Sequence, residues 1–244
     1  MQSIILASGY NKRVQHLFPN LPKIMFPLGD KPYLKYWLDI LLPQKTDIII
    51  LVQYSSSVIK KYVQKNYLKE VKSGKIKIID RPENLGPVRA VAQWKNIITG
   101  DFALFYCDTL FQIDLAKTKK SLGKKFLGLT FLTADKFNMF SDMEVMADKK
   151  TRLVTRFQPD AFAHSEGLMD VGQIYKKEVL DLFSKAPDTA EHFNFAAWPK
   201  LIREKKLTYY KVGPVFDIGT EKNYTATKKI FAREGLKALN DEEL

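Results

Sequence analysis

The sequence predicts an α/β fold built on a mixed, mostly parallel central sheet. In the first half of the chain, short apolar runs alternate with longer stretches whose apolar residues recur at helical spacing. The apolar runs are continuous, as is typical of strands buried on both faces of a sheet. The chain has 244 residues, 45% of them hydrophobic, which is enough to bury a sizeable core. Alternating strands and helices then predict parallel strands joined by right-handed crossovers.

In the first half, each element follows from its local pattern. The apolar run at residues 3–7 stops at a Ser-Gly pair and predicts a buried strand. The stretch 33–42 places Leu34, Trp37, Leu38 and Leu41 on one helix face, and Pro43 follows it. By the same criteria we expect further strands at 47–52, 75–79 and 102–107 and further helices at 56–64 and 88–98.

The second half is less regular. We expect strands at 126–134, 151–157, 169–175 and 207–212, a weaker strand at 143–147, and helices at 177–183, 195–204 and 221–234. Several of these strands follow one another without a helix between them, which indicates antiparallel pairing within a mixed sheet. No repeat or linker interrupts the pattern, so residues 1–244 are predicted to form one domain.

Composition and charge restrict the function classes. The chain has 39 Lys and Arg residues against 27 Asp and Glu residues, a net charge of +12, which suits anionic partners. Charge alone leaves nucleic acid, an anionic membrane surface and phosphorylated small molecules open. There is no membrane-length apolar run, no basic leader before the first apolar stretch, and one cysteine, Cys107. These features predict a cytoplasmic protein without membrane association.

The segment after the first strand is a candidate phosphate-binding loop. Residues 8–13, called the phosphate loop below, contain small residues followed by Lys12 and Arg13. Such a turn lets backbone N–H groups approach phosphate oxygens, with the cations supplying positive charge. An ordinary connection with two solvated cations explains the segment equally well. Downstream, Lys23 lies in a loop bracketed by Pro22 and Pro27, which fix the path of the chain.

Seven short motifs together resemble the sugar-1-phosphate nucleotidyltransferase family, which includes glucose-1-phosphate thymidylyltransferase and the mannose- and heptose-1-phosphate guanylyltransferases. The opening LAGGxGTRL of that family resembles LASGYNKRV at residues 6–14, and its P-K and P-L-x-x-K-P resemble residues 22–23 and 27–32. Further similarities are LGPVRA at residues 85–90, CDT at 107–109, DVG at 170–172 and DIGT at 217–220. The motifs keep their order along nearly the whole chain.

The resemblance implies a Rossmann-like nucleotidyltransferase domain and a specific reaction. An acceptor phosphate attacks the α-phosphorus of a nucleoside triphosphate and pyrophosphate leaves, so catalysis depends on positioning and charge neutralisation. Carried over by position, Arg13 holds the pyrophosphate, Lys23 holds the α-phosphate and acceptor phosphate, and Asp108 and Asp217 bind Mg²⁺. Taken singly, either aspartate could instead be an ordinary cap or turn residue; together they favour metal ligands.

The resemblance also implies two sets of binding residues. Those expected at the nucleotide are Leu6, Ala7, Ser8, Gly9, Lys12, Arg13, Glu83 and Gly86. Those expected at the acceptor are Lys23, Arg156, Asp170 and Gly172. Cys107 is interpreted as a small apolar residue rather than a nucleophile, and the three histidines lack the spacing of metal ligands.

The sequence departs from the family at positions that matter for the chemistry. Ser8, Asn11 and Lys12 replace Gly, Gly and Thr, and Pro87 and Arg89 replace Thr and Gly. The E-K pair that follows the strand ending at Phe157 would fall on Gln158 and Pro159, so the lysine of that pair is absent. Arg156 is a candidate substitute.

Three hypotheses about the function therefore remain. The first is an active Mg²⁺-dependent nucleotidyltransferase with a phosphorylated sugar or similar acceptor. The second is a family member that binds nucleotide or sugar nucleotide without turnover. The third and least favoured is nucleic-acid binding by the lysine-rich segment at residues 60–77, which also carries Tyr62 and Tyr67. The resemblance is compatible with a monomer or an oligomer.

Overall fold

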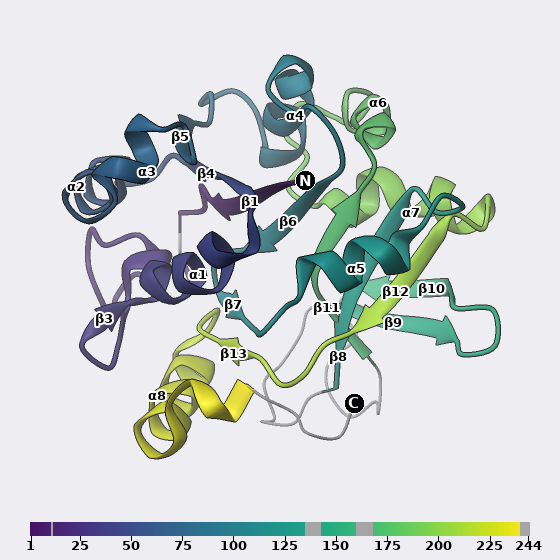
Figure 1. Ribbon diagram of the computed structural model, residues 1–244. Helices are drawn as coiled ribbons and strands as arrows, with labels where there is room; N and C mark the ends of the chain where they lie inside the picture. Colours follow the sequence, from purple (N-terminus) through teal and green to yellow (C-terminus); the bar gives the residue numbers. More distant parts are fainter. Residues whose placement is uncertain (11, 135–142, 160–167, 240–244) are drawn as a thin grey trace.

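A computed structural model describes residues 1–10, 12–134, 143–159 and 168–239. Its centre is a nine-stranded sheet in the order β5-β4-β1-β6-β11-β8-β12-β10-β9 (Figure 1). In chain order these strands are β1 (Gln2–Ala7), β4 (Asp47–Val52), β5 (Ile76–Asp80), β6 (Phe102–Tyr106), β8 (Gly128–Thr133), β9 (Met143–Asp148), β10 (Leu153–Pro159), β11 (Leu168–Tyr175) and β12 (Leu207–Lys211).

The strand directions confirm a mixed sheet, although only four of its eight neighbouring strand pairs are parallel. β5, β4, β1 and β6 pair in parallel, as do β8 and β12. β11 is antiparallel to both β6 and β8, and β10 is antiparallel to both β12 and β9. All the sheet's strands except β11 and β10 therefore run in one direction. The parallel strands end together at one edge, called the carboxyl edge below.

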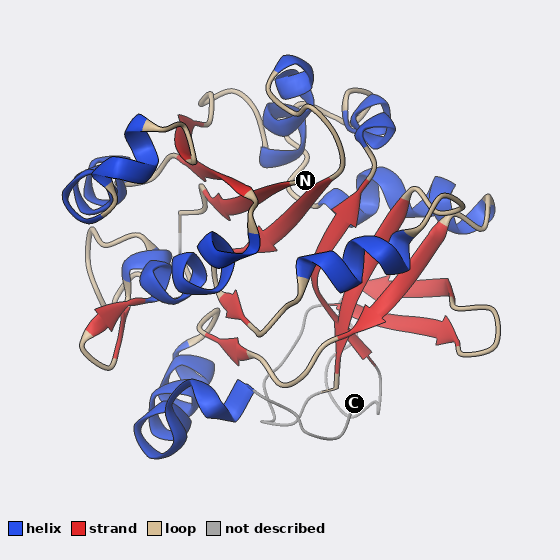
Figure 2. Cartoon of the chain, viewed as in Figure 1, coloured by secondary structure: helices blue, strands red, loops and turns tan. Residues whose placement is uncertain are grey.

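Helices cover both faces of this sheet (Figure 2). On one face lie α1 (Tyr33–Leu41), α2 (Ser56–Asn66), α5 (Leu115–Leu122) and α8 (Glu221–Glu234). On the other face lie α4 (Pro87–Ala92), α6 (Leu180–Phe183) and α7 (Phe193–Arg203). The short helix α3 (Leu68–Lys72) follows α2 and contacts β5.

Two apolar cores form because side chains of a strand alternate between the two faces. In β1, Ile5 packs into the core beneath α1, whereas Ile4 packs into the core beneath α4 and α7. Both side chains are completely buried. A strand that is buried on both sides needs the continuous apolar run seen in the sequence.

Several small elements complete the fold. β2 (Pro27–Leu28) pairs with β3 (Lys31–Pro32), and β7 (Thr109–Leu110) pairs antiparallel with β13 (Phe216–Asp217). Single 3-10 turns occur at Lys23–Met25, Leu42–Gln44, Gln93–Asn96, Lys177–Val179 and Gly235–Leu239.

Most predicted elements are confirmed to within a few residues, with three differences. The predicted helix 88–98 is α4 followed by the 3-10 turn Gln93–Asn96, with a kink at Trp94. The helices α3 and α5 and the two-stranded β2–β3 and β7–β13 pairs were not predicted. Finally, β8 does not pair with β9, because β11 and β12 flank it instead.

Candidate active site

The carboxyl edge gathers residues that are far apart in sequence. The segments that follow β1, β4, β5 and β6 start at Ser8, Gln53, Arg81 and Cys107. Open α/β sheets bind ligands beyond this edge. The phosphate loop and Asp108 both lie there, as the sequence predicted.

The β7–β13 ribbon brings Asp108 and Asp217 together. Asp217 pairs with Thr109, and Ile218 N donates to the Asp108 carbonyl at 2.9 Å. A Cβ placed on Gly219 would lie 3.2 Å from Asp217 Oδ1 and 3.4 Å from Asp108 Oδ2. The two carboxylates therefore face one small space beside Gly219, which has no side chain to fill it.

Buried Tyr33 supports this ribbon from the first helix of the chain. Its hydroxyl donates to the Phe216 carbonyl at 2.5 Å and to the Asp108 carbonyl at 3.4 Å. Burial, followed by the negative charges of Asp217 and Asp108, raises the pKa of Tyr33 well above its usual value. The tyrosine therefore stays protonated and serves as a hydrogen-bond donor.

Lys23 completes the cluster. It begins the 3-10 turn Lys23–Met25, and its Nζ lies 2.8 Å from Asp108 Oδ2. The side chain is 9% exposed and that of Asp108 is 24% exposed. Burial alone would lower the pKa of Lys23, but Asp108, Cys107 and Asp217 together outweigh burial, and the pKa is raised. Burial alone would raise the pKa of Asp108, yet Lys23, with a smaller effect from Arg13, lowers it. Both groups are charged at neutral pH.

Asp217 is in a different electrostatic environment. Burial and then the Asp108 charge raise its pKa, although Asn223 Nδ2 at 2.6 Å and Gly219 N at 2.8 Å donate to Oδ1. Thr227 Oγ1 also donates to the Asp217 carbonyl at 2.8 Å. Asn223 and Thr227 lie on α8, so this C-terminal helix holds Asp217 in position. Sequence reasoning missed both residues, and only their spacing after the DIGT motif could have indicated them.

The carboxylate pair Asp108 and Asp217 fits a magnesium ion by its chemistry. Both ligands are hard oxygen donors, and a cation between them would relieve the repulsion that raises the pKa of Asp217. Among the described residues there is no cluster of three or more His, Cys, Asp or Glu side chains that could hold a metal. Two carboxylates are enough for Mg²⁺ when phosphate oxygens and waters complete its shell.

The phosphate loop begins inside the protein and emerges at the surface. At the end of β1, Leu6 is half-buried and Ala7 is buried; within the loop, Ser8 is buried and Gly9 is exposed. Lys12 and Arg13 are also exposed, and Arg13 is close enough to lower the pKa of Asp108. Asn11, one of the departures from the family pattern, lies outside the described residues.

Residues 83–86, called the base loop below, contain the predicted nucleotide-binding residues Glu83 and Gly86 and pack tightly against the turn before α7. Glu83 is exposed, but Gly86 is buried and its N donates to the Asp188 carbonyl at 2.6 Å. A Cβ at Gly86 would lie 2.3 Å from the Ala190 carbonyl oxygen. The fold itself therefore requires glycine at this position.

The substitutions at Pro87 and Arg89 are accommodated. Pro87 is the first residue of α4, where its missing N–H removes no helical hydrogen bond. Arg89 Nε donates to Asp188 Oδ1 at 2.9 Å, and its NH1 donates to the Ser184 carbonyl. These contacts direct the guanidinium toward the connection between α6 and α7.

On the predicted acceptor side, Asp170 is buried in a polar network. Thr130 Oγ1 at 2.7 Å, Tyr106 Oη at 3.0 Å and Gln173 Nε2 all donate to its carboxylate. Burial nevertheless raises the pKa of Asp170 to about 6. Sequence reasoning missed the three donors, which lie on β8, β6 and β11.

Of the other residues expected at the acceptor, Gly172 lies in a segment linked to Asp108, whereas Arg156 does not contact the carboxylate pair in the described part of the chain. Gly172 has a φ of 155°, and a Cβ there would lie 2.8 Å from the Leu104 carbonyl oxygen. Thr109 Oγ1 donates to the Val171 carbonyl at 3.5 Å, which links this segment to Asp108. Arg156 is exposed on β10, opposite Met146 of β9, and no contact within the described part of the chain joins it to Lys23 or the carboxylate pair.

The structure also describes the surroundings of Cys107 and His16, whereas His164 lies outside the described residues. Burial raises the pKa of the Cys107 thiol to about 12, which disfavours the thiolate. His16 is exposed and its Nε2 lies 3.0 Å from Glu221 Oε2. No helix in the described ranges is both long and apolar enough to cross a membrane.

Comparison with known proteins places these features in a family. The family model described as "Nucleotidyl transferase" matches residues 2–234. D-glycero-alpha-D-manno-heptose 1-phosphate guanylyltransferase of Campylobacter jejuni is 29% identical over 75% of this chain and 80% of its own length. The bifunctional protein GlmU of Methanococcus aeolicus is 31% identical over 47% of this chain, which spans only 26% of that protein.

The fold comparison agrees. The crystal structure of HddC from Yersinia pseudotuberculosis aligns with a TM-score of 0.76, covering 94% of this chain and 99% of that one at 19% identity. The resemblance to sugar-1-phosphate nucleotidyltransferases drawn from the motifs is confirmed. The chain belongs to the nucleotidyl transferase family and is an enzyme of that class.

Proposed function

We propose that this protein transfers a nucleoside monophosphate from a nucleoside triphosphate to the phosphate of a phosphorylated sugar or similar metabolite, releasing pyrophosphate. The main support for this proposal is the cluster of Lys23, Asp108 and Asp217 at the carboxyl edge. A cation and two carboxylates next to a phosphate loop suit a reaction between two anions. Both substrate classes fit the family.

The chain's own residues would position and neutralise the reacting phosphates. An oxygen of the acceptor phosphate forms a bond to the α-phosphorus while the bond to the β-phosphate oxygen breaks, and pyrophosphate carries away the electron pair. Lys23 is charged and held rigidly by Asp108, so its ammonium can stabilise charge on the α-phosphate and acceptor oxygens. Arg13 at the exposed end of the phosphate loop would hold the departing pyrophosphate.

Enzymes of the family are generally divalent-metal dependent. We assign Asp108 and Asp217 as the residues that would hold Mg²⁺. When bound, the ion supplies positive charge to the phosphate oxygens. Asn223 and Gly219 N orient Asp217, and Lys23 orients Asp108, so both carboxylates are placed before any ligand arrives.

On the nucleotide side, we propose contacts from Leu6 and Ala7 at the end of β1 and from Ser8, Gly9 and Lys12 in the phosphate loop. Glu83 and Gly86 of the base loop complete this set. On the acceptor side we propose Lys23, Asp170 and Gly172, with Arg156 as a further cation. The catalytic residues are then Arg13, Lys23 and Asp108. The single cysteine suits a cytoplasmic location.

The test is an assay of pyrophosphate release with each nucleoside triphosphate against a panel of sugar phosphates and phosphorylated alcohols. GTP with a heptose 1-phosphate is the first pair, because the Campylobacter jejuni relative is named for that chemistry.

A second candidate function, binding without turnover, is favoured by Gln158 and Pro159, which replace the E-K pair of the family. If nucleotide or sugar nucleotide binds but no pair of substrates reacts, that second candidate is correct.

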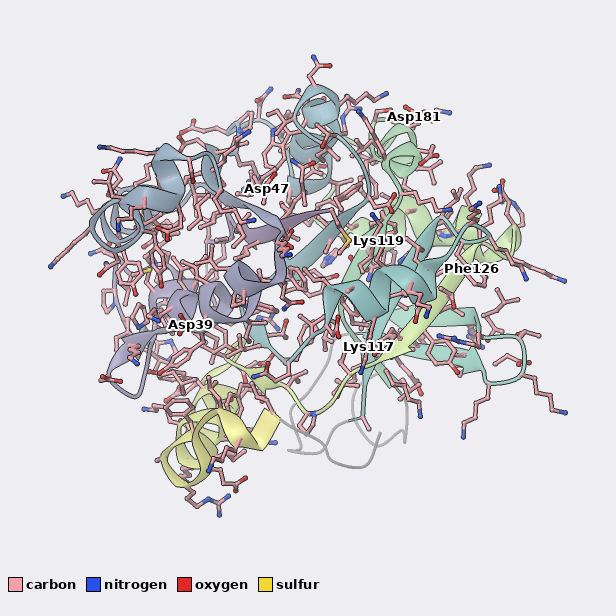
Figure 3. All side chains as sticks on the ribbon, viewed as in Figure 1. Asp39, Asp47, Lys117, Lys119, Phe126 and Asp181 are labelled. Carbon is pink, nitrogen blue, oxygen red and sulfur yellow. The ribbon has the colours of Figure 1, made fainter. Side chains whose placement is uncertain are left out.

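The metal assignment predicts the effect of Asp108→Asn. The variant keeps the shape of the side chain but loses a charge on which both Lys23 and a metal depend. We expect turnover to fall by roughly 100-fold or more, with little loss of fold. Asp39→Asn is the matched control, since Asp39 forms an exposed pair with Lys35 on α1 at 2.6 Å (labelled in Figure 3). Unchanged Mg²⁺-dependent rates in Asp108→Asn would contradict the assignment.

A further inference from the structure

A buried arginine lies between the two loops proposed to bind the nucleotide. Arg81 follows β5, and its backbone N donates to the Val52 carbonyl at 2.7 Å, which extends the pairing of β4 with β5. The residue is only 8% exposed. Arginine is almost never buried to this extent unless it is paired with an anion.

The guanidinium joins three segments of the carboxyl edge. NH1 donates to the Leu85 carbonyl, next to Gly86 in the base loop. NH2 donates to the Ser8 carbonyl of the phosphate loop at 3.4 Å and also to Gln53 Oε1, just beyond β4. One planar side chain thus connects the phosphate loop, the base loop and the end of β4.

Stability alone explains this arrangement poorly. Every group that accepts from Arg81 is a neutral oxygen, and no ion pair between described residues includes it. Arg81 Nε and Gln53 Nε2 are buried donors with no acceptor among the described atoms. A buried cation with incomplete hydrogen bonding is costly, and an anionic ligand nearby would offset part of that cost.

We propose that Arg81 is a positioning residue that fixes the separation of the phosphate loop and the base loop, and so preorganises the nucleotide site. This inference rests on the proposed function. Two hydrogen bonds hold the base loop. Gly86 N donates to the Asp188 carbonyl in the turn before α7, and Arg81 NH1 donates to the Leu85 carbonyl. Its charge also favours a triphosphate in the adjacent phosphate loop.

The shape of the side chain matters as well as its charge. Guanidinium presents a planar fork of donors, whereas the ammonium of lysine is a compact point charge on a flexible chain. Arg81→Lys therefore keeps the charge but loses the connection between segments, and Arg81→Met loses both. Comparing the two variants separates electrostatic attraction from loop positioning.

The experiment measures nucleotide binding to the full chain by calorimetry, using GTP and the other nucleoside triphosphates without acceptor. We expect Arg81→Met to weaken the binding of the preferred nucleotide roughly tenfold or more, and Arg81→Lys to have an intermediate effect. The KM for nucleotide rises while the KM for acceptor stays within about twofold. The control is Arg203→Met, at an exposed arginine that ends α7.

A second measurement does not depend on any ligand. Hydrogen exchange should become roughly tenfold faster at both the phosphate loop and the base loop in Arg81→Met, and should stay unchanged in Arg203→Met. Unchanged exchange at either loop, or equal increases of both KM values, would overturn the inference. If the wild-type protein binds no nucleotide, the proposed function fails, and hydrogen exchange still decides whether Arg81 positions the loops.

Discussion

At the scale of single residues, Asp108 and Asp170 show two ways of burying a carboxylate. Asp108 has a cation, Lys23, at 2.8 Å, and its pKa is lowered. Asp170 receives hydrogen bonds from Thr130, Tyr106 and Gln173 but contacts no cation among the described residues. Burial therefore outweighs those hydrogen bonds and raises its pKa to about 6.

This raised pKa predicts a pH-dependent effect of Asp170→Asn. The ordinary pKa of aspartate is 3.8, so the unfolded chain gives up this proton at a lower pH than the folded protein does. The stability contributed by the protonated form is fully present below about pH 4 and is lost as the pH rises through 6. Asparagine cannot ionise and avoids that loss. We expect Asp170→Asn to gain up to about 3 kcal/mol relative to wild type between pH 4 and pH 7.

The surrounding network can adapt to the new amide. Gln173 Oε1 is a buried acceptor with no donor among the described atoms, so a rotated Gln173 amide could accept from asparagine. Urea unfolding at several pH values between 4 and 8 measures the difference, with Asp101→Asn as a more exposed control. A stability difference between Asp170→Asn and wild type that does not vary with pH would contradict the prediction.

At the scale of elements, the start of α4 is fixed by contact with the turn before α7. Gly86 N donates to Asp188, and Val88 N lies 3.4 Å from the Ala190 carbonyl. The backbones approach so closely that a Cβ on Gly86 would lie 2.3 Å from the oxygen of Ala190. The contact couples the base loop to the α7 side of the sheet.

Gly86→Ala should therefore lower the free energy of unfolding by roughly 1–3 kcal/mol, because neither backbone segment can move without breaking hydrogen bonds. Nucleotide affinity should fall in the same variant, since the base loop must shift. Gly100→Ala is the matched control, because a Cβ at Gly100 meets nothing within 4 Å. Equal free energies of unfolding for the two variants would contradict this prediction, because they would show that the turn before α7 can move to accommodate the Cβ.

The elements differ in how far the sequence could predict them. The boundaries of β4 and α8 follow from a continuous apolar run and a long helical pattern. The helix α5 buries only Leu115, Thr118 and Leu122, so its apolar signal is weak. The β7–β13 ribbon has two residues in each strand, too few for any periodicity.

The same limit applies to the site. Motifs identified Lys23, Asp108 and Asp217, because each keeps its place relative to strand ends. The partners Tyr33, Asn223 and Arg81 could not be predicted. Each acts through a contact between segments distant in the chain, and side-chain direction decides such contacts.

At the scale of the whole molecule, the net charge of +12 comes from lysines and arginines on many elements, not only from those at the carboxyl edge. Figure 3 shows nitrogen-tipped side chains around the outline of the molecule, and it labels Lys117 and Lys119 on α5. In the lysine-rich segment 60–77, Lys60 lies 2.6 Å from Asp80 and Lys75 lies 3.7 Å from Asp47. These pairs neutralise part of that segment.

The lysines near the opposite edge of the sheet should contribute little to the reaction. Lys65, Lys69 and Lys72 are exposed at the end of α2 and on α3, before β5 begins. The length of β5 separates that end from the carboxyl edge by about 17 Å, roughly twice the screening length of about 8 Å at physiological salt. Replacing all three by glutamine should change the KM for nucleotide less than about twofold. The substitution Lys12→Gln, within the phosphate loop, should raise the KM for nucleotide several-fold. Salt-dependent RNA binding that disappears in the triple variant, without a change in KM, would instead assign the surplus charge to nucleic acid.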